Sequence, residues 1–290
     1  MPRLAIVTPS YAPDAELCAD LVRSVLVHGS ASVQHHIIVP PRDLKLFAHL
    51  RDSRVQIHPT SDFLPGSVLP VPGTNLNVNL RRPWPPIRGW VLQQITKLAA
   101  ASHFDADVVL LVDSDTEFVR PFGPETYLQD GVVRFYRLPH AVDNQLPRHV
   151  LWHHAARRLL GLPPAEPPFH DYVNMPCAWS PALVRAMQRR IGEVTGRPWQ
   201  SAVGGQLHVS EMMLYGVFVD HLADESARGF TRSDMMCRNH YDEVPLTENE
   251  LRSFSDDLAD GDIAVMVSAK SGTPRSVRRS VLDTLAQRSD

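Results

Sequence analysis

Two aspartates, Asp113 and Asp115, stand one serine apart at the end of a strongly apolar run. The five residues before them, 108–112, are all aliphatic, which is typical of a central strand buried on both faces. Sheets of this kind usually bind ligands at the carboxyl ends of their strands. Because residues two apart in an extended chain point the same way, the two carboxylates could hold one hard divalent cation, and that cation could hold a diphosphate. The competing interpretation is a pair of solvated carboxylates in a turn.

The composition limits the class of protein. A chain of 290 residues with 43% hydrophobic residues can bury a large core. Its net charge of −3 gives no indication of a nucleic-acid partner or of binding to a membrane surface. The three cysteines are widely spaced and form no CxxC pair, which favours a reducing, cytoplasmic location. No apolar run reaches the ~18 residues of a membrane span, and the apolar part of the N-terminus is too short for a signal peptide.

The order of the expected elements indicates an α/β fold, with a doubly wound, mainly parallel sheet and helices on both faces. Residues 59–88 are rich in Pro, Gly and Asn, and we expect a long irregular loop there, either functional or mobile. In the first half of the chain, strands are expected at 3–8, 34–40, 54–59 and 108–112, and helices after a cap at Asp14, at 41–50 and at 89–102.

The pattern is looser after residue 121. A strand is expected at 131–138, helices at 144–161, 181–195 and 210–222, a late strand at 262–269 and a basic helix at 274–287. We interpret residues 1–290 as one domain, with residues 1–120 as a nucleotide-binding half and residues 121–290 as a half that shapes the acceptor site.

Four segments, in this order, resemble the GT-A class of nucleotide-sugar glycosyltransferases: IVTPSY (6–11), RGWVLQQITKL (88–98), LVDSDTEF (111–118) and SEMMLYGVF (210–218). The chain looks most like a bacterial group of sugar transferases that share the QQxxKL helix and the S-E-x-x-x-Y-G segment. The scarcity of lysine, three against 26 arginines, fits a GC-rich actinobacterium that makes glycosylated natural products.

The resemblance implies a GT-A-like fold and a metal-dependent sugar transfer. The donor would be a nucleoside-diphosphate sugar and the acceptor a small molecule or a glycan. We expect inversion at the anomeric carbon, and retention is the alternative. The cofactor would be Mn²⁺ or Mg²⁺, a Lewis acid that neutralises the leaving diphosphate. The resemblance makes Asp115 a direct metal ligand and Asp113 a weaker ligand that also contacts the ribose, with Ser114 between them at the nucleotide. It places the third ligand late in the chain, where His240 is our choice.

The donor would lie against the first strand end and the helix at 89–102. Tyr11 offers a stacking face and Thr8 a hydroxyl, while Gln93 and Lys97 lie one helical turn apart. Arginines of the C-terminal segment could close over the diphosphate, because a guanidinium donates two parallel hydrogen bonds. Packing on the following helix, a solvated helix face and an ordinary basic helix are the alternatives. The expected donor contacts are Thr8, Pro9, Ser10, Tyr11, Arg88, Gln93, Gln94, Lys97, Asp113, Ser114, Lys270 and Arg275.

On the acceptor side, Glu211 is the expected catalytic base. It follows Ser210, a plausible helix cap, and the positive end of the helix dipole favours the ionised carboxylate that a base requires. The alternative is that Glu211 only complements this dipole. Asn174 and Trp152 are the expected acceptor contacts.

Three other functions fit parts of the pattern. A phosphatase of the haloacid-dehalogenase kind also begins with an aspartate pair after an apolar strand, but Glu117 stands where that class has Thr or Val. A sugar-nucleotide pyrophosphorylase would have a Gly-rich phosphate loop after the first strand, and this chain has none there. A non-catalytic binding module with the GT-A-like fold would not need Asp113, Asp115 and Glu211 together.

Overall fold

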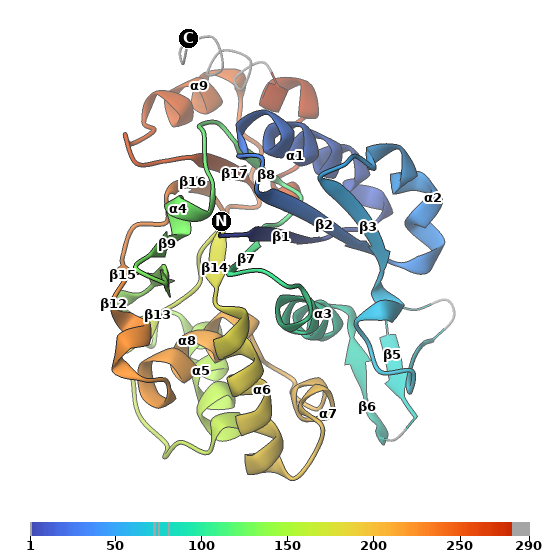
Figure 1. The fold of residues 1–290 in the computed structure, drawn as a ribbon, viewed down its shortest axis with the longest axis vertical. Coiled ribbons are helices and arrows are strands. Elements are labelled where there is room, and N and C mark those ends of the chain that lie inside the picture. Colours follow the sequence, from blue (N-terminus) through green and yellow to red (C-terminus); the bar gives the residue numbers. More distant parts are fainter. Residues whose placement is uncertain (1, 72–73, 75, 81, 280–290) are drawn as a thin grey trace.

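The computed structural model describes residues 2–71, 74, 76–80 and 82–279. A five-stranded sheet lies at the centre, in the order β14–β7–β1–β2–β3 (Figure 1). Neighbours among β7, β1, β2 and β3 are parallel, whereas β14 is antiparallel to β7. The predicted mainly parallel sheet is therefore confirmed, and the antiparallel edge strand is an addition. The strands are β1 (Leu4–Pro9), β2 (Val33–Val39), β3 (Val55–Pro59), β7 (Val108–Leu111) and β14 (Cys177–Trp179).

Helices cover both faces of this sheet, as the sequence predicts (Figure 1). The alternation of β2 shows why. Ile37 and Val39 pack with the apolar side of α1 and with α2, while Ile38 between them joins the main core on the other face. The helices on the first face are α1 (Ala15–His28) and α2 (Leu44–Phe47), and the layer on the other face contains α3 (Gly89–His103), α5 (Pro147–Leu160), α6 (Pro181–Thr195) and α8 (Glu211–Leu222).

A second sheet, β16–β17–β8, continues from the aspartate segment. Its strand β8 (Thr116–Phe118) follows Asp115 directly and pairs with β17 (Ala264–Val267), so the late part of the chain lies beside the aspartates. Smaller elements complete the second half: α4 (Pro124–Tyr127), β9 (Leu128–Gln129), β10 (Val132–Val133), β11 (Phe135–Tyr136), β12 (Leu138–Val142), β13 (Phe169–Asp171), α7 (Trp199–Gly204), β15 (Thr231–Arg232), β16 (Cys237–His240) and α9 (Glu248–Asp256).

Three expected elements differ from the structure. The expected loop at 59–88 contains an antiparallel sheet of β4 (Val68–Pro70), β5 (Leu76–Asn79) and β6 (Arg82–Arg88), with the proline-containing β6 at its edge, where a missing N–H is tolerated. The helix expected at 41–50 is divided between short 3₁₀ turns and α2.

The strand expected at 131–138 is split among β10, β11 and β12, because each pairs with a different partner. The expected helix at 274–287 is helical at 275–279, and its part from residue 280 onward lies outside the described residues.

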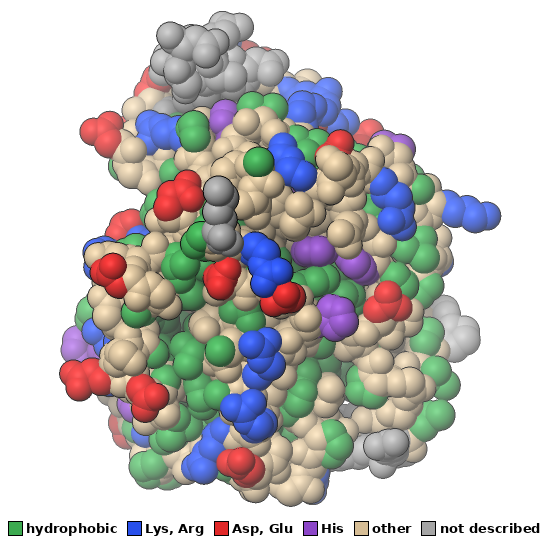
Figure 2. Space-filling model, in the orientation of Figure 1, with side chains coloured by type: hydrophobic (Ala, Val, Ile, Leu, Met, Phe, Trp, Pro, Cys, Tyr) green, Lys and Arg blue, Asp and Glu red, His purple; other side chains and the backbone are tan. Residues whose placement is uncertain are grey.

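The surface carries acidic and basic side chains interspersed over the face shown in Figure 2. This distribution agrees with the small net charge of −3. Among the described residues, no helix is both long and apolar enough to cross a membrane.

The helix α8 has its closest packing contact at Gly216, where the ring of Tyr172 lies against the helix. A Cβ at Gly216 would stand 2.1 Å from Cγ of Tyr172. One turn further on, Asp220 accepts a hydrogen bond from the Tyr172 hydroxyl at 2.6 Å and another from Arg137 at 2.9 Å. Tyr172 is therefore fixed at both its ring and its hydroxyl, and it cannot move aside for a larger residue.

Gly216→Ala is expected to lower the free energy of unfolding by about 1–3 kcal/mol, the range for overpacking a core, although alanine normally favours a helix. Gly192→Ala on α6 is the matched control, because a Cβ there meets only a carbonyl oxygen at 3.6 Å. The control should be neutral or stabilising by up to about 1 kcal/mol. Urea denaturation of both variants checks this, and equal stabilisation of the two would contradict the packing argument.

Candidate active site

The site lies where the order of the central sheet reverses. From β1 the chain passes to β2 and β3 on one side, and then crosses through α3 to β7 on the other side of β1. Ligands of α/β sheets bind at such a switch point, outside the carboxyl ends of the strands. Here the two strand ends are joined directly, since the Ser114 hydroxyl donates to the Ser10 hydroxyl at 2.9 Å and both side chains are buried.

Lys97 is the central cation of the site. Its Nζ lies 2.9 Å from Oδ1 of Asp113 and 3.1 Å from Oε1 of Glu211. Lys97 and Glu211 are each 3% exposed, whereas the Asp113 side chain is 39% exposed. Burial alone would lower the pKa of Lys97, but the two carboxylates outweigh it and raise this pKa above its ordinary value. Lys97 therefore stays charged and connects the end of β7 to the start of α8.

Residues at the start and along one face of α3 form a series of hydrogen bonds with the segment 207–211. Arg88 donates to the carbonyl of Leu207, and Trp90 Nε1 donates to the carbonyl of Val209 at 3.2 Å. The buried Gln94 accepts from the backbone N–H of Glu211 at 3.1 Å, one turn before Lys97. The three α3 residues Trp90, Gln94 and Lys97 are spaced by four and three positions, so they form one stripe. This stripe fixes where Glu211 begins α8.

Asp115 is held by the end of β17. Its Oδ2 accepts from the backbone N–H of Ala269 at 2.7 Å. Burial, and then the charge of Asp113, raise the pKa of Asp115 to about 6. Burial and Asp113 likewise raise the pKa of Asp14, whose side chain makes no capping bond to α1, contrary to expectation. Three carboxylates thus repel one another at the switch point, and a bound cation would relieve that repulsion.

Asp113 and Asp115 fit a metal site in which a bound substrate supplies further ligands. They do not form a closed site made of protein ligands alone. Within the described part of the chain, no group of three or more His, Cys, Asp or Glu side chains is placed to hold a metal. Mg²⁺ commonly binds through one or two carboxylates plus phosphates and water, and Asp113 and Asp115 can supply the two carboxylates. The expected third ligand, His240, is engaged elsewhere: its Nε2 lies 3.0 Å from the carbonyl of Val244.

The expected donor contacts at the end of β1 divide into two groups. Thr8 is fully buried, and its hydroxyl lies 2.9 Å from Nε2 of His35. The expectation that this hydroxyl lines a base pocket therefore needs correction, because it points into the core. Pro9 is buried as well. Tyr11 is 47% exposed and keeps a free ring face at the edge of the site. On α3, Gln93 is half-buried.

Arg275 and Arg279 of the basic C-terminal segment bind α1, so these two arginines are not free to close over a diphosphate. Arg275 and Arg279 both donate to the buried Asp20, each at 2.8 Å, and Arg275 also pairs with Glu16. Burial would raise the pKa of Asp20, but these guanidinium groups hold it below its ordinary value. Lys270, in contrast, is largely exposed, with a long 3.8 Å ion pair to Glu243. It follows Ala269, the residue that holds Asp115.

On the acceptor side, Asn174 lies in the segment next to Asp113. The backbone N–H of Asp113 contacts the sulfur of Met175 at 3.4 Å. Asn174 is buried and donates to the carbonyl of Pro176 at 2.8 Å, while its Oδ1 has no hydrogen-bond partner among the described residues. An unpaired buried oxygen is costly, so this position favours a ligand or a water as its partner.

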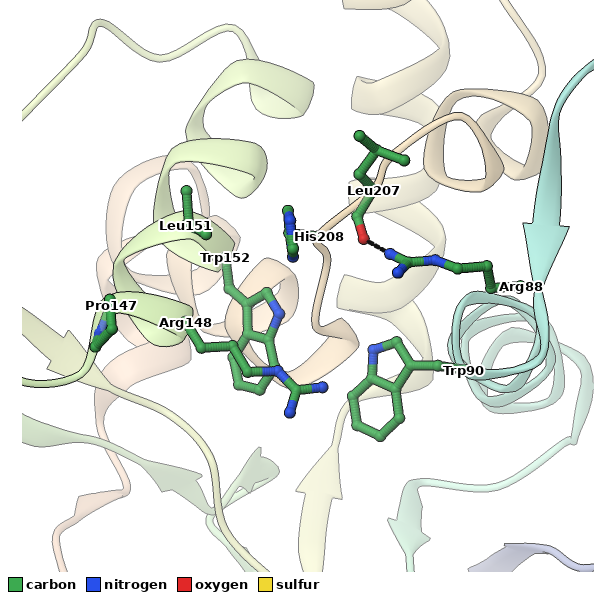
Figure 3. A pocket seen from close by; sticks show the side chains of 8 residues that line it. All are labelled: Arg88, Trp90, Pro147, Arg148, Leu151, Trp152, Leu207 and His208. Carbon is green, nitrogen blue, oxygen red and sulfur yellow. Dashed lines mark hydrogen bonds between the residues drawn. The ribbon is translucent and has the colours of Figure 1, made fainter.

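A cavity of ≈ 490 Å³ lies at the beginning of α3 and of α5 (Figure 3). The indoles of Trp90 and Trp152 face each other at 6.3 Å, with an angle of 13° between their planes. The guanidinium of Arg148 lies beside this pair, 5.3 Å from the ring centre of Trp90 and 5.0 Å from that of Trp152. The cavity is lined by Arg88, Trp90, Pro147, Arg148, Leu151, Trp152, Leu207 and His208.

The sequence predicted Trp152 as an acceptor contact and Arg88 as a donor contact, but it did not predict the cavity that both residues line. Arg148 and His208 lie 60 positions apart, and no local pattern connects them. The available signal was weak: two of the five tryptophans, Trp90 and Trp152, stand near the starts of expected helices.

The chain belongs to the family described as "Family of unknown function (DUF6492)", which matches residues 4–259. No curated protein matches it. Among solved structures, the galactosyltransferase LgtC in complex with donor and acceptor sugar analogs is similar to this chain, at 13% sequence identity and a TM-score of 0.47. The alignment covers 98% of this chain and 95% of that one. A similarity of this extent assigns neither an activity nor site residues.

The buried contact between Lys97 and Glu211 can be tested by a double-mutant cycle. Lys97→Met leaves Glu211 buried without its cation, and is expected to cost about 3–5 kcal/mol of unfolding free energy. Glu211→Gln should cost less, because Lys97 keeps Asp113. The double variant should be more stable than the sum of the single effects by about 1–3 kcal/mol. Lys45→Met, at an exposed lysine on α2, is the control and should change little. Additive effects would contradict the coupling.

Proposed function

We propose that this protein is a glycosyltransferase that moves a sugar from a nucleoside-diphosphate donor to a small-molecule or glycan acceptor, and that it depends on Mn²⁺ or Mg²⁺. One observation carries the proposal. At the switch point of the sheet, the partly exposed Asp113 and Asp115 follow the end of β7, while Lys97, which pairs with Asp113, is buried. Binding a diphosphate through a cation is a use that accounts for this arrangement.

Asp113 and Asp115 would hold the divalent cation, which would neutralise the nucleoside diphosphate as it leaves. Tyr11, exposed beside the end of β1, would stack on the base of the nucleotide. Lys270 would place its ammonium group near the diphosphate, because its neighbour Ala269 already holds Asp115. Asn174 would present its unpaired oxygen to a sugar hydroxyl.

For Glu211 we propose a positioning role in place of the general base expected from the sequence. A base must reach the proton that it removes, whereas this carboxylate is buried and 3.1 Å from Lys97. By holding Lys97, Glu211 fixes the orientation of Asp113, which is the carboxylate in contact with the ligand. Replacement of Glu211 would then act through the cation site and would weaken metal-dependent binding.

Metal-dependent nucleotide binding tests this function directly. Isothermal titration with UDP, GDP, CDP and ADP, each with Mn²⁺ and with EDTA, should give a binding signal for at least one nucleotide that needs the metal. Asp115→Asn should abolish that signal, because one carboxylate of the cation site is lost. Asp105→Asn, at an exposed aspartate that pairs with Arg3 on the surface, is the matched control and should bind as the wild type does.

Two results would refute the proposal. The first is the absence of metal-dependent binding of every nucleotide to the wild-type protein. The second is equal metal-dependent affinity in Asp115→Asn and in the wild type.

A further inference from the structure

We propose that the cavity between the starts of α3 and α5 binds a negatively charged group, a carboxylate or a phosphate, carried on a ring of the acceptor. This inference rests on the proposed sugar transfer and names the chemical class of the acceptor. The cavity has the volume for such a ring, and the indoles of Trp90 and Trp152 in its lining offer aromatic surface to that ring.

The charged side chains that line the cavity favour the binding of an anion. Arg88, Arg148 and His208 line it, and none of its lining residues among those described is acidic. Arg88 contacts the carbonyl of Leu207, and Arg148 contacts the two indoles. In the part of the chain that the structure describes, neither guanidinium pairs with a carboxylate. The arginines of the C-terminal segment differ in this respect, because two of them share Asp20.

The two indoles hold Arg148 in place for a ligand. A guanidinium stacked on aromatic rings keeps its N–H groups at its edge, where they can donate two parallel hydrogen bonds to a carboxylate or a phosphate. The first turns of α3 and α5 add to the positive potential. Neither contains an acidic residue, and neither is capped by a hydrogen bond from the side chain of its N-cap residue.

The cavity and the aspartates are joined by the stripe on α3. Trp90 at the cavity and Lys97 at Asp113 lie seven residues apart on one face, which is ~10 Å along a helix. The segment 207–211 runs beside this stripe, with His208 in the cavity and Glu211 at Lys97. A ligand whose anionic end lies in the cavity could therefore extend toward the cation site and present a hydroxyl there.

Tryptophan fluorescence can follow binding to this cavity without an activity assay. The probes are glucuronic acid and glucose 6-phosphate, with methyl glucoside as the neutral comparison. We expect saturable quenching by at least one anionic probe and none by the neutral one. Arg148→Gln should weaken anion binding about tenfold or more, the scale of one charged hydrogen-bonding contact. Arg189→Gln, at an exposed arginine on α6, is the matched control and should leave the affinity unchanged.

Nucleotide titration of the same variants separates this inference from the proposed function. Arg148→Gln should keep metal-dependent nucleotide binding, which places the anion site apart from the donor site. Loss of nucleotide binding in this variant would overturn the acceptor assignment and make the cavity part of the donor site. Absence of quenching by both anionic probes, with nucleotide binding intact, would overturn this inference alone. Anion binding without any nucleotide binding would refute sugar transfer as the purpose of the cavity.

Discussion

A single buried lysine sets the geometry on which the rest of the site depends. An ammonium group withdrawn from water costs several kcal/mol unless carboxylates compensate it, and Lys97 has two of them within 3.1 Å. These come from different elements, the end of β7 and the start of α8, while Lys97 itself belongs to α3. None of the three can shift without leaving a charge unpaired. The orientation of the Asp113 side chain is therefore a consequence of the core.

The same contact explains which chemistry the carboxylates can perform. Glu211 and Asp113 share one lysine, but of these two carboxylates only Asp113 is accessible to solvent. Asp115 has no such lysine, and its raised pKa reflects burial and the nearby charge of Asp113. The two aspartates thus differ, since Asp113 pairs with a buried lysine and Asp115 accepts a backbone hydrogen bond from Ala269. Such a site suits a divalent cation that arrives together with a diphosphate.

The parts of this structure that local patterns determine were predictable from the sequence. The aliphatic run at 108–112 predicted a buried strand, and β7 covers its first four residues. The ligand site expected at the end of this strand stays a prediction. Helical spacing placed Lys97 on α3. It could not show that Lys97 is buried, because this burial depends on contacts with β7 and α8. The sequence also could not show that Arg275 pairs with Asp20, because Asp20 lies 255 positions away. Pro, Gly and Asn suggested a loop at 59–88, yet β4, β5 and β6 within it pair as an antiparallel sheet.

The two ends of the α3 stripe carry opposite charge, and this separation bears on how an acceptor would be oriented. Asp14, Asp113 and Asp115 gather at the end near Lys97, whereas Arg88 and Arg148 gather at the other. An anionic acceptor placed at random would be repelled by the aspartates. Under the proposed function, the arginines would hold its charged end about two helical turns away, ~10 Å. Only an uncharged hydroxyl would then approach the cation, so one helix would position the acceptor and also exclude its wrong orientation.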